Sequence, residues 1–338
     1  MFGRMKSIAA TAFATPAQRA NSSAERLGLE VCDFSESAHM DLNVLNEGLA
    51  RVQSGGFKAL ETYYTKEFAS KRRLVSGRRA YAVLDDIPDK LINSEMAPRF
   101  AEGRLPEFRD MWEESGRNAF ASAIYAQLLF NTGYAFRGTN WARNVSQEGW
   151  DKLASYTEEA HDVLLQSSQE ADRCPLWHRV LHSIGLSDGS DTEQLEQRFQ
   201  RARQFDPCDV DIYWTRAYHL LPRWHGSYEE IEAFAKDSVT RTQHELGTSI
   251  YARIYTSIRG SEHISETDAN WQTMKKSFED WAGLVNSQRP INMYASMASL
   301  FGDEKTLRSI VSNRMTEFHA ECWQDNRQAA VAFETLLK

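Results

Sequence analysis

The sequence has few cysteines and no long apolar run. Its 338 residues contain four cysteines without a C-x-x-C pair, at Cys32, Cys174, Cys208 and Cys322. This excludes a disulfide framework and a zinc finger, and it is typical of thiols in a reducing compartment. No apolar run approaches the roughly 18 residues that a membrane span requires. We therefore expect no membrane span.

The short motifs of common enzyme classes are also missing. No serine lies in G-x-S-x-G, and there is neither a glycine-rich phosphate loop nor a dinucleotide-binding fingerprint. Strand signals are poor, because β-branched residues do not alternate and no Asn-Gly or Asp-Gly turn joins such runs. The sequence therefore predicts an all-α protein. It assigns no catalytic residue, no metal ligand and no cofactor.

Charge argues against a nucleic-acid partner. The net charge is −8, which disfavours general affinity for nucleic acid or anionic lipid. A basic cluster, KRRLVSGRR at 71–79, contains no aromatic residue, whereas nucleic-acid binding favours aromatics within a basic domain. A solvated face or an internal counter-charge is the favoured interpretation. LDDIPD at 84–89 offers carboxylates for acid–base catalysis, but a turn with a helix cap is favoured.

The N-terminus affects the expected location. Residues 1–24 contain three basic residues and no acidic residue. A basic start followed by IAATAFA faintly resembles a secretory signal, but alanine and threonine are weakly apolar. We expect a flexible N-terminal extension over 1–30 and a cytoplasmic protein. A secreted or periplasmic protein with a weak signal is the less favoured alternative.

Residues 204–235, QFDPCDVDIYWTRAYHLLPRWHGSYEEIEAFA, carry the strongest architectural pattern. Ala202 lies five residues before Pro207, as at the end of a tetratricopeptide unit. The aromatic, small and large positions of the next unit's first helix follow at Tyr213, Ala217 and Leu220. We expect tetratricopeptide-like antiparallel helical hairpins that stack into a right-handed superhelix or α-solenoid. Such an array buries apolar faces between neighbours and leaves an extended binding surface.

Helical periodicity and its interruptions organise the rest of the chain. A helical hairpin region is predicted over 31–100, with Gly55 and Gly56 between its two helices, and a tetratricopeptide-like helical array over 105–338. Helix starts within the array are marked by capping patterns or by a first-turn proline. These are Ser227 with Glu230, Asp191 with Gln194, and Pro175.

Three segments occur in a characteristic order: GYAFRGTNWARNVSQEGW at 133–150, FDPCD at 205–209 and LLPRWHGSYEEIEAFA at 220–235. Over about residues 105–285 the chain resembles an uncharacterised bacterial family, which is catalogued as a domain of unknown function and grouped with tetratricopeptide-like proteins. The family usually carries Gly where this chain has His225. The resemblance implies an α-helical repeat fold in a bacterial protein. It supplies no substrate and no catalytic residue.

Two loops contain the candidate binding residues. Arg223, Trp224 and His225 place a guanidinium, an indole and an imidazole between helix ends, where they offer contacts to an anion or to an aromatic-anchored peptide. In the structural alternative, Trp224 fills the gap between helices and Arg223 caps carbonyls. Arg137 and Trp141 have the same two interpretations, ligand binding or a structural role, because Arg137 can also form an ion pair with an acidic neighbour.

CPLWHRVLH offers three metal-capable side chains, Cys174, His178 and His182, at helical spacing. Zinc requires a fourth ligand from another element. Arg179 stands where the glutamate of an H-E-x-x-H protease would be, and its charge opposes a metal. A structural or solvated helix face is favoured over a metal site.

These observations favour a non-catalytic protein that binds a protein or peptide partner. One version is an acidic immunity protein that neutralises a basic toxin, and another is an adaptor. The first alternative is a carbohydrate-active or lyase-type enzyme on an α/α toroid, which requires acidic side chains converging in an aromatic cleft. The second is a metal-dependent protein built on CPLWHRVLH.

Overall fold

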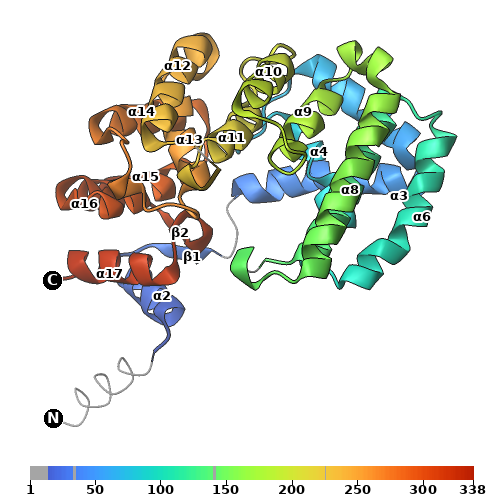
Figure 1. The fold of residues 1–338 in the computed structure, drawn as a ribbon. Coiled ribbons are helices and arrows are strands. Elements are labelled where there is room, and N and C mark those ends of the chain that lie inside the picture. Colours follow the sequence, from blue (N-terminus) through green and yellow to red (C-terminus); the bar gives the residue numbers. More distant parts are fainter. Residues whose placement is uncertain (1–13, 33–35, 140–141, 225) are drawn as a thin grey trace. The chain divides into compact units, whose positions relative to one another are not determined.

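The computed structural model describes residues 14–32, 36–139, 142–224 and 226–338. Within these ranges the chain is mostly helical, with 16 α-helices, α2 to α17, and two strands of three residues each (Figure 1). This confirms the predicted helical class, and the short strand pair is an addition to it. Among the described helices, none combines the length and the apolar character that crossing a bilayer would need.

The chain divides into two compact units. Unit 1 comprises the described residues up to 40, residues 75–77 and residues 226–338, and unit 2 comprises residues 41–74 and 78–225. Unit 2 therefore holds the middle of the sequence, whereas unit 1 combines segments from both ends.

Unit 2 is built around one buried helix. Its helices are α3 (Glu36–Ser70, which starts in unit 1), α4 (Ala80–Leu84), α5 (Ile87–Leu91), α6 (Pro98–Glu114), α7 (Ala119–Arg137), α8 (Gln147–Gln166), α9 (Pro175–Ser183), α10 (Thr192–Arg203) and α11 (Val210–His219). Helix α7 packs against α5, α6, α8 and α9. Most of its residues are buried, because its sequence is apolar on all sides. Asn118 caps its start by accepting a hydrogen bond from the Ala121 amide at 2.9 Å.

Helix α3 is interrupted where the sequence predicts a break. Gly55 and Gly56 have non-helical backbone angles, and Gly56 has a φ of +62°, a region that residues with a Cβ rarely adopt. After the break, Phe57, Leu60 and Tyr64 are buried in the core of unit 2. The predicted pair of helices around the two glycines is therefore present.

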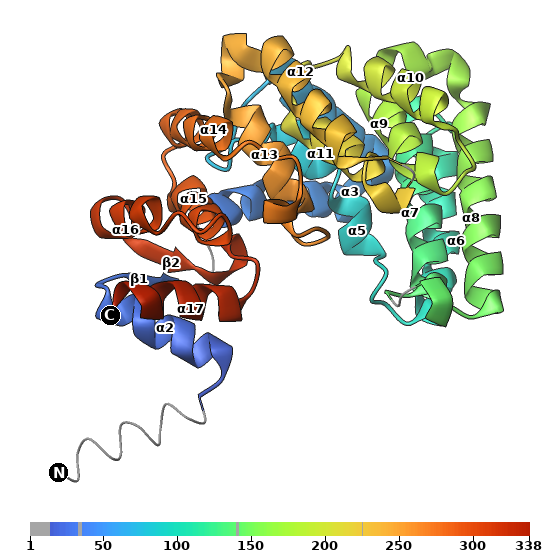
Figure 2. The ribbon, with the colours of Figure 1, turned by 60° about the vertical axis from the view of Figure 1, so that its left-hand side comes forward.

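Unit 1 contains a series of helices that follow one another in space as in sequence. They are α12 (Tyr228–Leu246), α13 (Ser249–Ile258), α14 (Trp271–Leu284), α15 (Gln288–Leu300) and α16 (Glu304–Asn313). Each packs against the next, as the orange and red ribbons show (Figure 2). Between α14 and α15, Phe278 stacks on Tyr294 with ring centroids 4.9 Å apart. Between α12 and α13, buried Glu232 accepts hydrogen bonds from Tyr251 and Tyr255, at 2.6 and 2.7 Å.

The two ends of the described chain meet in unit 1. Helix α2 (Pro16–Arg26) packs against α17 (Asn326–Leu336), and Arg19 binds both carboxylate oxygens of Glu334, at 2.8 and 2.7 Å. Residues 16–26 of the predicted extension thus form a packed helix, and residues 1–13 lie outside the described residues. Residue 105, where the predicted array begins, lies within α6.

The strand pair also joins sequence ends. Strand β1 (Glu30–Cys32) is parallel to β2 (Glu317–His319), with Cys32 paired to His319. On the face of β2 that points into the core, Phe318 makes edge-to-face contacts with Trp323 and Phe333. Parallel pairing of two strands from opposite ends of a chain needs a long connection, so no local sequence signal predicts it.

The predicted helix starts are confirmed, with a complete capping box at one of them and an N-cap bond alone at another. Asp191 and Gln194 form a reciprocal capping box at the start of α10, and Ser227 accepts a hydrogen bond from the Glu230 amide at 3.1 Å at the start of α12. Pro175 lies in the first turn of α9. Both helices predicted within 204–235 are present, as α11 in unit 2 and α12 in unit 1.

Candidate functional site

Four charged segments that are separate in the sequence meet inside unit 2. They are the basic cluster, LDDIPD, the helix formed by CPLWHRVLH, and FDPCDVD at the start of α11. We call their charged side chains the Arg–Asp network. Its members are Arg78, Arg79, Asp85, Asp86, Arg179, Asp206, Asp209 and Asp211. The basic cluster thus supplies internal counter-charges, one of the two favoured interpretations.

Asp206 occupies one end of the network. Arg79 donates to its two oxygens at 2.9 and 3.4 Å, and Lys71 lies 3.6 Å away. Burial alone would raise the pKa of Asp206, but hydrogen bonding and charge from Arg79 outweigh it, so the pKa is lowered. The Tyr81 hydroxyl lies 3.0 Å from both Asp206 and Asp209. The hydroxyl has one proton, so it donates to one of the two carboxylates at a time. Its position between them connects Asp206 with Asp209.

Arg179 lies between two buried carboxylates. It forms ion pairs with Asp85 and Asp209. Burial raises the pKa of Asp85 to about 8, and the charge of Arg179 limits that rise. Burial also raises the pKa of Asp209, although Arg179 opposes this. Because Asp85 is buried and lies near the charge of Asp209, it keeps a proton at neutral pH even beside Arg179.

Arg78 joins the turn before α5 to the start of α11. Its guanidinium donates to Asp86 at 2.8 Å and to Asp211 at 2.6 and 2.8 Å. The turn predicted from LDDIPD is present, because α4 ends at Leu84 and α5 begins at Ile87. Its two central aspartates point into the network.

A pocket of about 350 Å³ opens beside the Arg–Asp network. This volume is at the lower end of the range for small-ligand sites. Its charged lining consists of four carboxylates and two guanidinium groups: Asp85, Asp86, Asp89, Asp211, Arg78 and Arg179. Trp214 and Thr215 of α11 and Ser183 of α9 complete the polar wall. With a proton on Asp85, three carboxylates and two guanidinium groups remain in the lining, so the pocket favours a ligand that carries a positive charge.

Several buried polar atoms of this wall have no hydrogen-bond partner among the described residues. They are Oδ1 of Asp85, Oδ1 of Asp211 and Nε1 of Trp214. The other oxygen of Asp85, Oδ2, pairs with Nε of Arg179. An unsatisfied buried polar group costs about 1–3 kcal/mol. A bound group or water that supplies N–H or O–H donors to the carboxylates would remove this cost.

A second pocket in unit 2, of about 660 Å³, lies where Cys174 meets the start of α7. Its acidic residues have structural partners, since Glu170 accepts from the Ala119 amide at 3.3 Å and Glu61 accepts from Asn118 at 2.9 Å. These contacts satisfy donors at the start of α7. The smaller pocket is therefore the better candidate site.

The described members of the predicted binding set lie outside this pocket lining: Arg137 is the last residue of α7, and Arg223 and Trp224 belong to a 3-10 turn, Pro222–Trp224. Arg137 donates to the Gly138 carbonyl at 2.8 Å and stacks on Trp150 at 5.3 Å. Trp224 is half-buried, with its ring 6.0 Å from Tyr218, and Arg223 is exposed. Trp141 and His225 lie outside the described residues. Binding through these residues stays a prediction.

Cys174, His178 and His182, the metal-capable residues of CPLWHRVLH, each have different neighbours. Cys174 lines the larger pocket, and burial raises the pKa of its thiol to about 12. The His178 ring lies 5.3 Å from Phe205, and the His182 ring lies 4.5 Å from His219. Burial lowers the pKa of His178 to about 4 and places the pKa of His182 well below its ordinary value.

The sequence supplied the members of the Arg–Asp network but not their pairing. In the sequence, Arg179 is interpreted as a charge that opposes a metal ion, and Asp209 is interpreted as part of the FDPCD segment. The available signal was charge complementarity, since one basic segment and two aspartate-rich segments occur in an otherwise mixed chain. Trp214 gave no signal, because tryptophans at helix contacts are common.

Comparison of the chain with protein-family models, with curated proteins and with solved structures finds no match, so the functional assignment rests on the site's own geometry.

Proposed function

We propose that this chain is a non-catalytic binding protein whose pocket in unit 2 receives a basic side chain of a protein partner. The observation that carries the proposal is the unsatisfied acceptor Oδ1 of Asp211, in a pocket that the carboxylates of Asp86 and Asp89 also line. A guanidinium or ammonium group brings several N–H donors and no acceptor. Arginine fits best, because its planar group can donate to two carboxylates and stack on the Trp214 ring.

The architecture supports the same proposal. Packed pairs such as α12 with α13 and α14 with α15 are consistent with tetratricopeptide-like hairpins stacked into a superhelix or α-solenoid. Stacked hairpins offer an extended surface around a specificity pocket. An acidic chain of net charge −8 attracts a basic partner at long range. A toxin-neutralising immunity protein is one protein class with these properties, and an adaptor is another.

Calorimetric titration with three blocked peptides that differ at one central residue tests the proposal. We expect the arginine peptide to bind more tightly than the lysine peptide, and the glutamine peptide not to bind. Thr215→Leu fills the pocket and lowers the affinity at least about 10-fold, which corresponds to about 1.4 kcal/mol.

Thr240→Leu is the matched control, because Thr240 is exposed on α12. Both threonine hydroxyls donate to the carbonyl four residues earlier, at 3.4 Å, so both replacements remove the same kind of local hydrogen bond. Equal binding of the arginine and glutamine peptides, or unchanged affinity in Thr215→Leu, contradicts the proposal.

One observation favours a second candidate, a carbohydrate-active or lyase-type enzyme. Asp85, with a pKa of about 8, keeps its proton at neutral pH, as a general acid must. Other carboxylates and Trp214 line the same pocket. This candidate predicts release of reducing ends from a polysaccharide panel, and loss of that activity in Asp85→Asn. Peptide binding without turnover separates the two candidates.

A further inference from the structure

We propose that Cys32, Glu317 and His319 form a zinc-binding site in unit 1. One sulfur, one carboxylate oxygen and one imidazole nitrogen from these residues all lie within 4.8 Å of one another. Thiolate, imidazole and carboxylate are the three kinds of side-chain ligand that zinc takes in proteins. The inference is independent of the pocket in unit 2.

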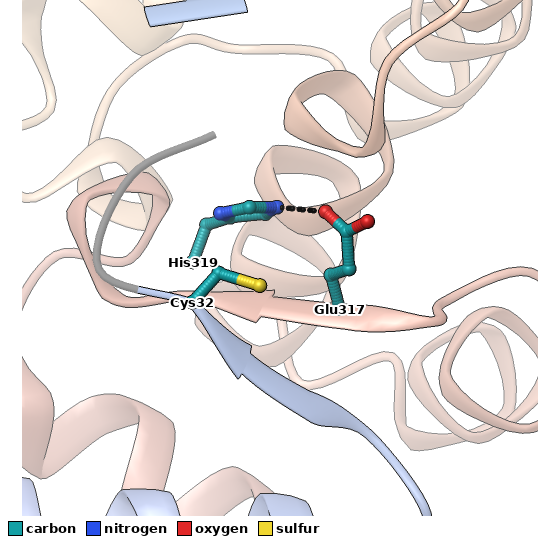
Figure 3. A group of neighbouring side chains, drawn as sticks. All are labelled: Cys32, Glu317 and His319. Carbon is teal, nitrogen blue, oxygen red and sulfur yellow. Dashed lines mark hydrogen bonds and ion pairs between the residues drawn. The ribbon is translucent and has the colours of Figure 1, made fainter. Parts of the chain in front are cut away.

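The strand pair places these three side chains on one face. In a parallel pair, residues in register point to the same side, and residues two apart in one strand do so as well. Cys32 is in register with His319, and Glu317 precedes His319 by two positions. Figure 3 shows the three functional ends gathered on one side of the strands. The opposite face carries Phe318, which is fully buried.

Asn292 of α15 holds this part of β2 in place. Its side chain donates to the Glu317 carbonyl at 3.0 Å and accepts from the His319 amide at 3.0 Å. Asn292 itself is fully buried. The backbone that carries two of the three ligands is thus fixed by the core of unit 1, as a pre-organised metal site requires.

Two of the three ligand atoms already lie closer together than the ligands of a bound zinc ion would. His319 Nε2 lies 2.7 Å from Glu317 Oε2, and the dashed line in Figure 3 marks this contact. With Zn–N of about 2.0 Å and Zn–O of about 2.1 Å, tetrahedral ligands lie roughly 3.4 Å apart. A small side-chain rotation of Glu317 would therefore admit the ion. Glu317 has the freedom to rotate, since its side chain is 35% exposed.

His319 would bind the ion through Nε2, the ring nitrogen that faces Glu317. Its side chain is 1% exposed, so the core around it fixes the orientation of the ring. Nδ1, on the other side of the ring, would not contact the ion. Metal coordination would use the imidazole in its neutral form and balance the charge of the thiolate and the carboxylate. Three protein ligands leave a fourth zinc position for water.

Titration of the full chain with Co²⁺, after treatment with a chelator and in oxygen-free buffer, tests the site. We expect one equivalent to produce a near-ultraviolet sulfur-to-cobalt charge-transfer band, which one equivalent of Zn²⁺ abolishes. Cys32→Ser removes this band, and His319→Gln and Glu317→Gln weaken zinc binding. Outer-sphere partners alone change metal affinity by about 10–100-fold, so losing a direct ligand lowers it at least as much.

His263→Gln is the control, because His263 is an exposed histidine of the same unit, and we expect it to leave the band unchanged. Circular dichroism of each metal-free variant shows whether it is folded. If His319→Gln unfolds, Cys32→Ser still tests the site, because Cys32 is only half-buried. Absence of a one-equivalent band in the wild type overturns the proposal. A band of equal intensity in folded Cys32→Ser does so too.

Discussion

Arg179 and Asp209 form an ion pair in which 12% and 3% of the two side chains are exposed. The same guanidinium pairs with Asp85. Removing charges from water is costly, and a buried pair repays this cost only when both partners remain. Arg179 is therefore important for the stability of unit 2, whatever the pocket binds.

Replacement of this arginine is the first prediction. Arg179→Met keeps much of the aliphatic volume but leaves the Asp209 carboxylate buried without its counter-charge. We expect the free energy of unfolding, measured by urea denaturation, to fall by about 3–5 kcal/mol. Arg201→Met serves as the control, because Arg201 pairs with Asp172 and their side chains are 45% and 78% exposed. Its effect should stay below about 1 kcal/mol, and a similar loss in both variants would rule out the burial argument.

The second prediction concerns the pH dependence that Asp85 creates. Its pKa is raised from 3.8 to about 8, so the folded state holds a proton that the unfolded state releases. The stability that Asp85 contributes is fully present below about pH 4 and is lost as pH rises to 8. Asp85→Asn imitates the protonated form at every pH. Between pH 5 and 8 we expect the wild type to lose about 2–5 kcal/mol relative to the variant, as urea denaturation will show; parallel curves would contradict the raised pKa.

A buried histidine gives the third prediction, in which stability changes with pH in the direction opposite to that expected for Asp85. Burial, reinforced by Arg216, lowers the pKa of His219 from 6.5 to about 3. The unfolded state therefore takes up a proton near pH 6.5 that the folded state refuses, and stability falls as pH decreases. His219→Gln removes this site. Between pH 6.5 and 4, the wild type should lose about 2–3 kcal/mol relative to the variant. His263→Gln, at an exposed position, should retain the wild-type pH dependence.

Local patterns predicted the helices well, because their causes are local. The capping box of Asp191 and Gln194 satisfies backbone donors within one turn, and the break at Gly55 and Gly56 needs no distant contact. The strand pair of β1 and β2 is different. It depends on the chain ends meeting within unit 1, and a three-residue strand carries too little pattern to be recognised.

The candidate site was harder to predict for a related reason. The side chains that stand out in the sequence, such as Trp224 and Arg137, contact residues close to them in the sequence, Tyr218 and Gly138 respectively. The pocket instead depends on long-range pairing between Arg78 and Asp211, which are far apart in sequence. Charge complementarity narrows the possible partners of an arginine, but the fold decides which carboxylate it meets.

The fourth prediction tests a close packing contact in unit 1. Gly77 has a φ of +83°, and a Cβ at this position would lie 2.4 Å from Nη2 of Arg253. Arg253 cannot move aside easily, since it is 1% exposed and lies over the Trp281 ring at 4.4 Å. Gly77→Ala therefore combines backbone strain of about 1–2 kcal/mol with overpacking of about 1–3 kcal/mol.

Gly28→Ala separates these two effects. Gly28 also belongs to unit 1 and has a φ of +79°, but apart from Gly28 and its two chain neighbours no described residue has an atom within 4 Å of the position that its Cβ would occupy. It should therefore show the backbone strain alone. In thermal and urea unfolding we expect Gly77→Ala to be the less stable variant by about 1–3 kcal/mol. Equal losses of stability would mean that the Arg253 side chain can move away from the new methyl group. The close packing of its guanidinium between Gly77 and Trp281 would then not limit its position.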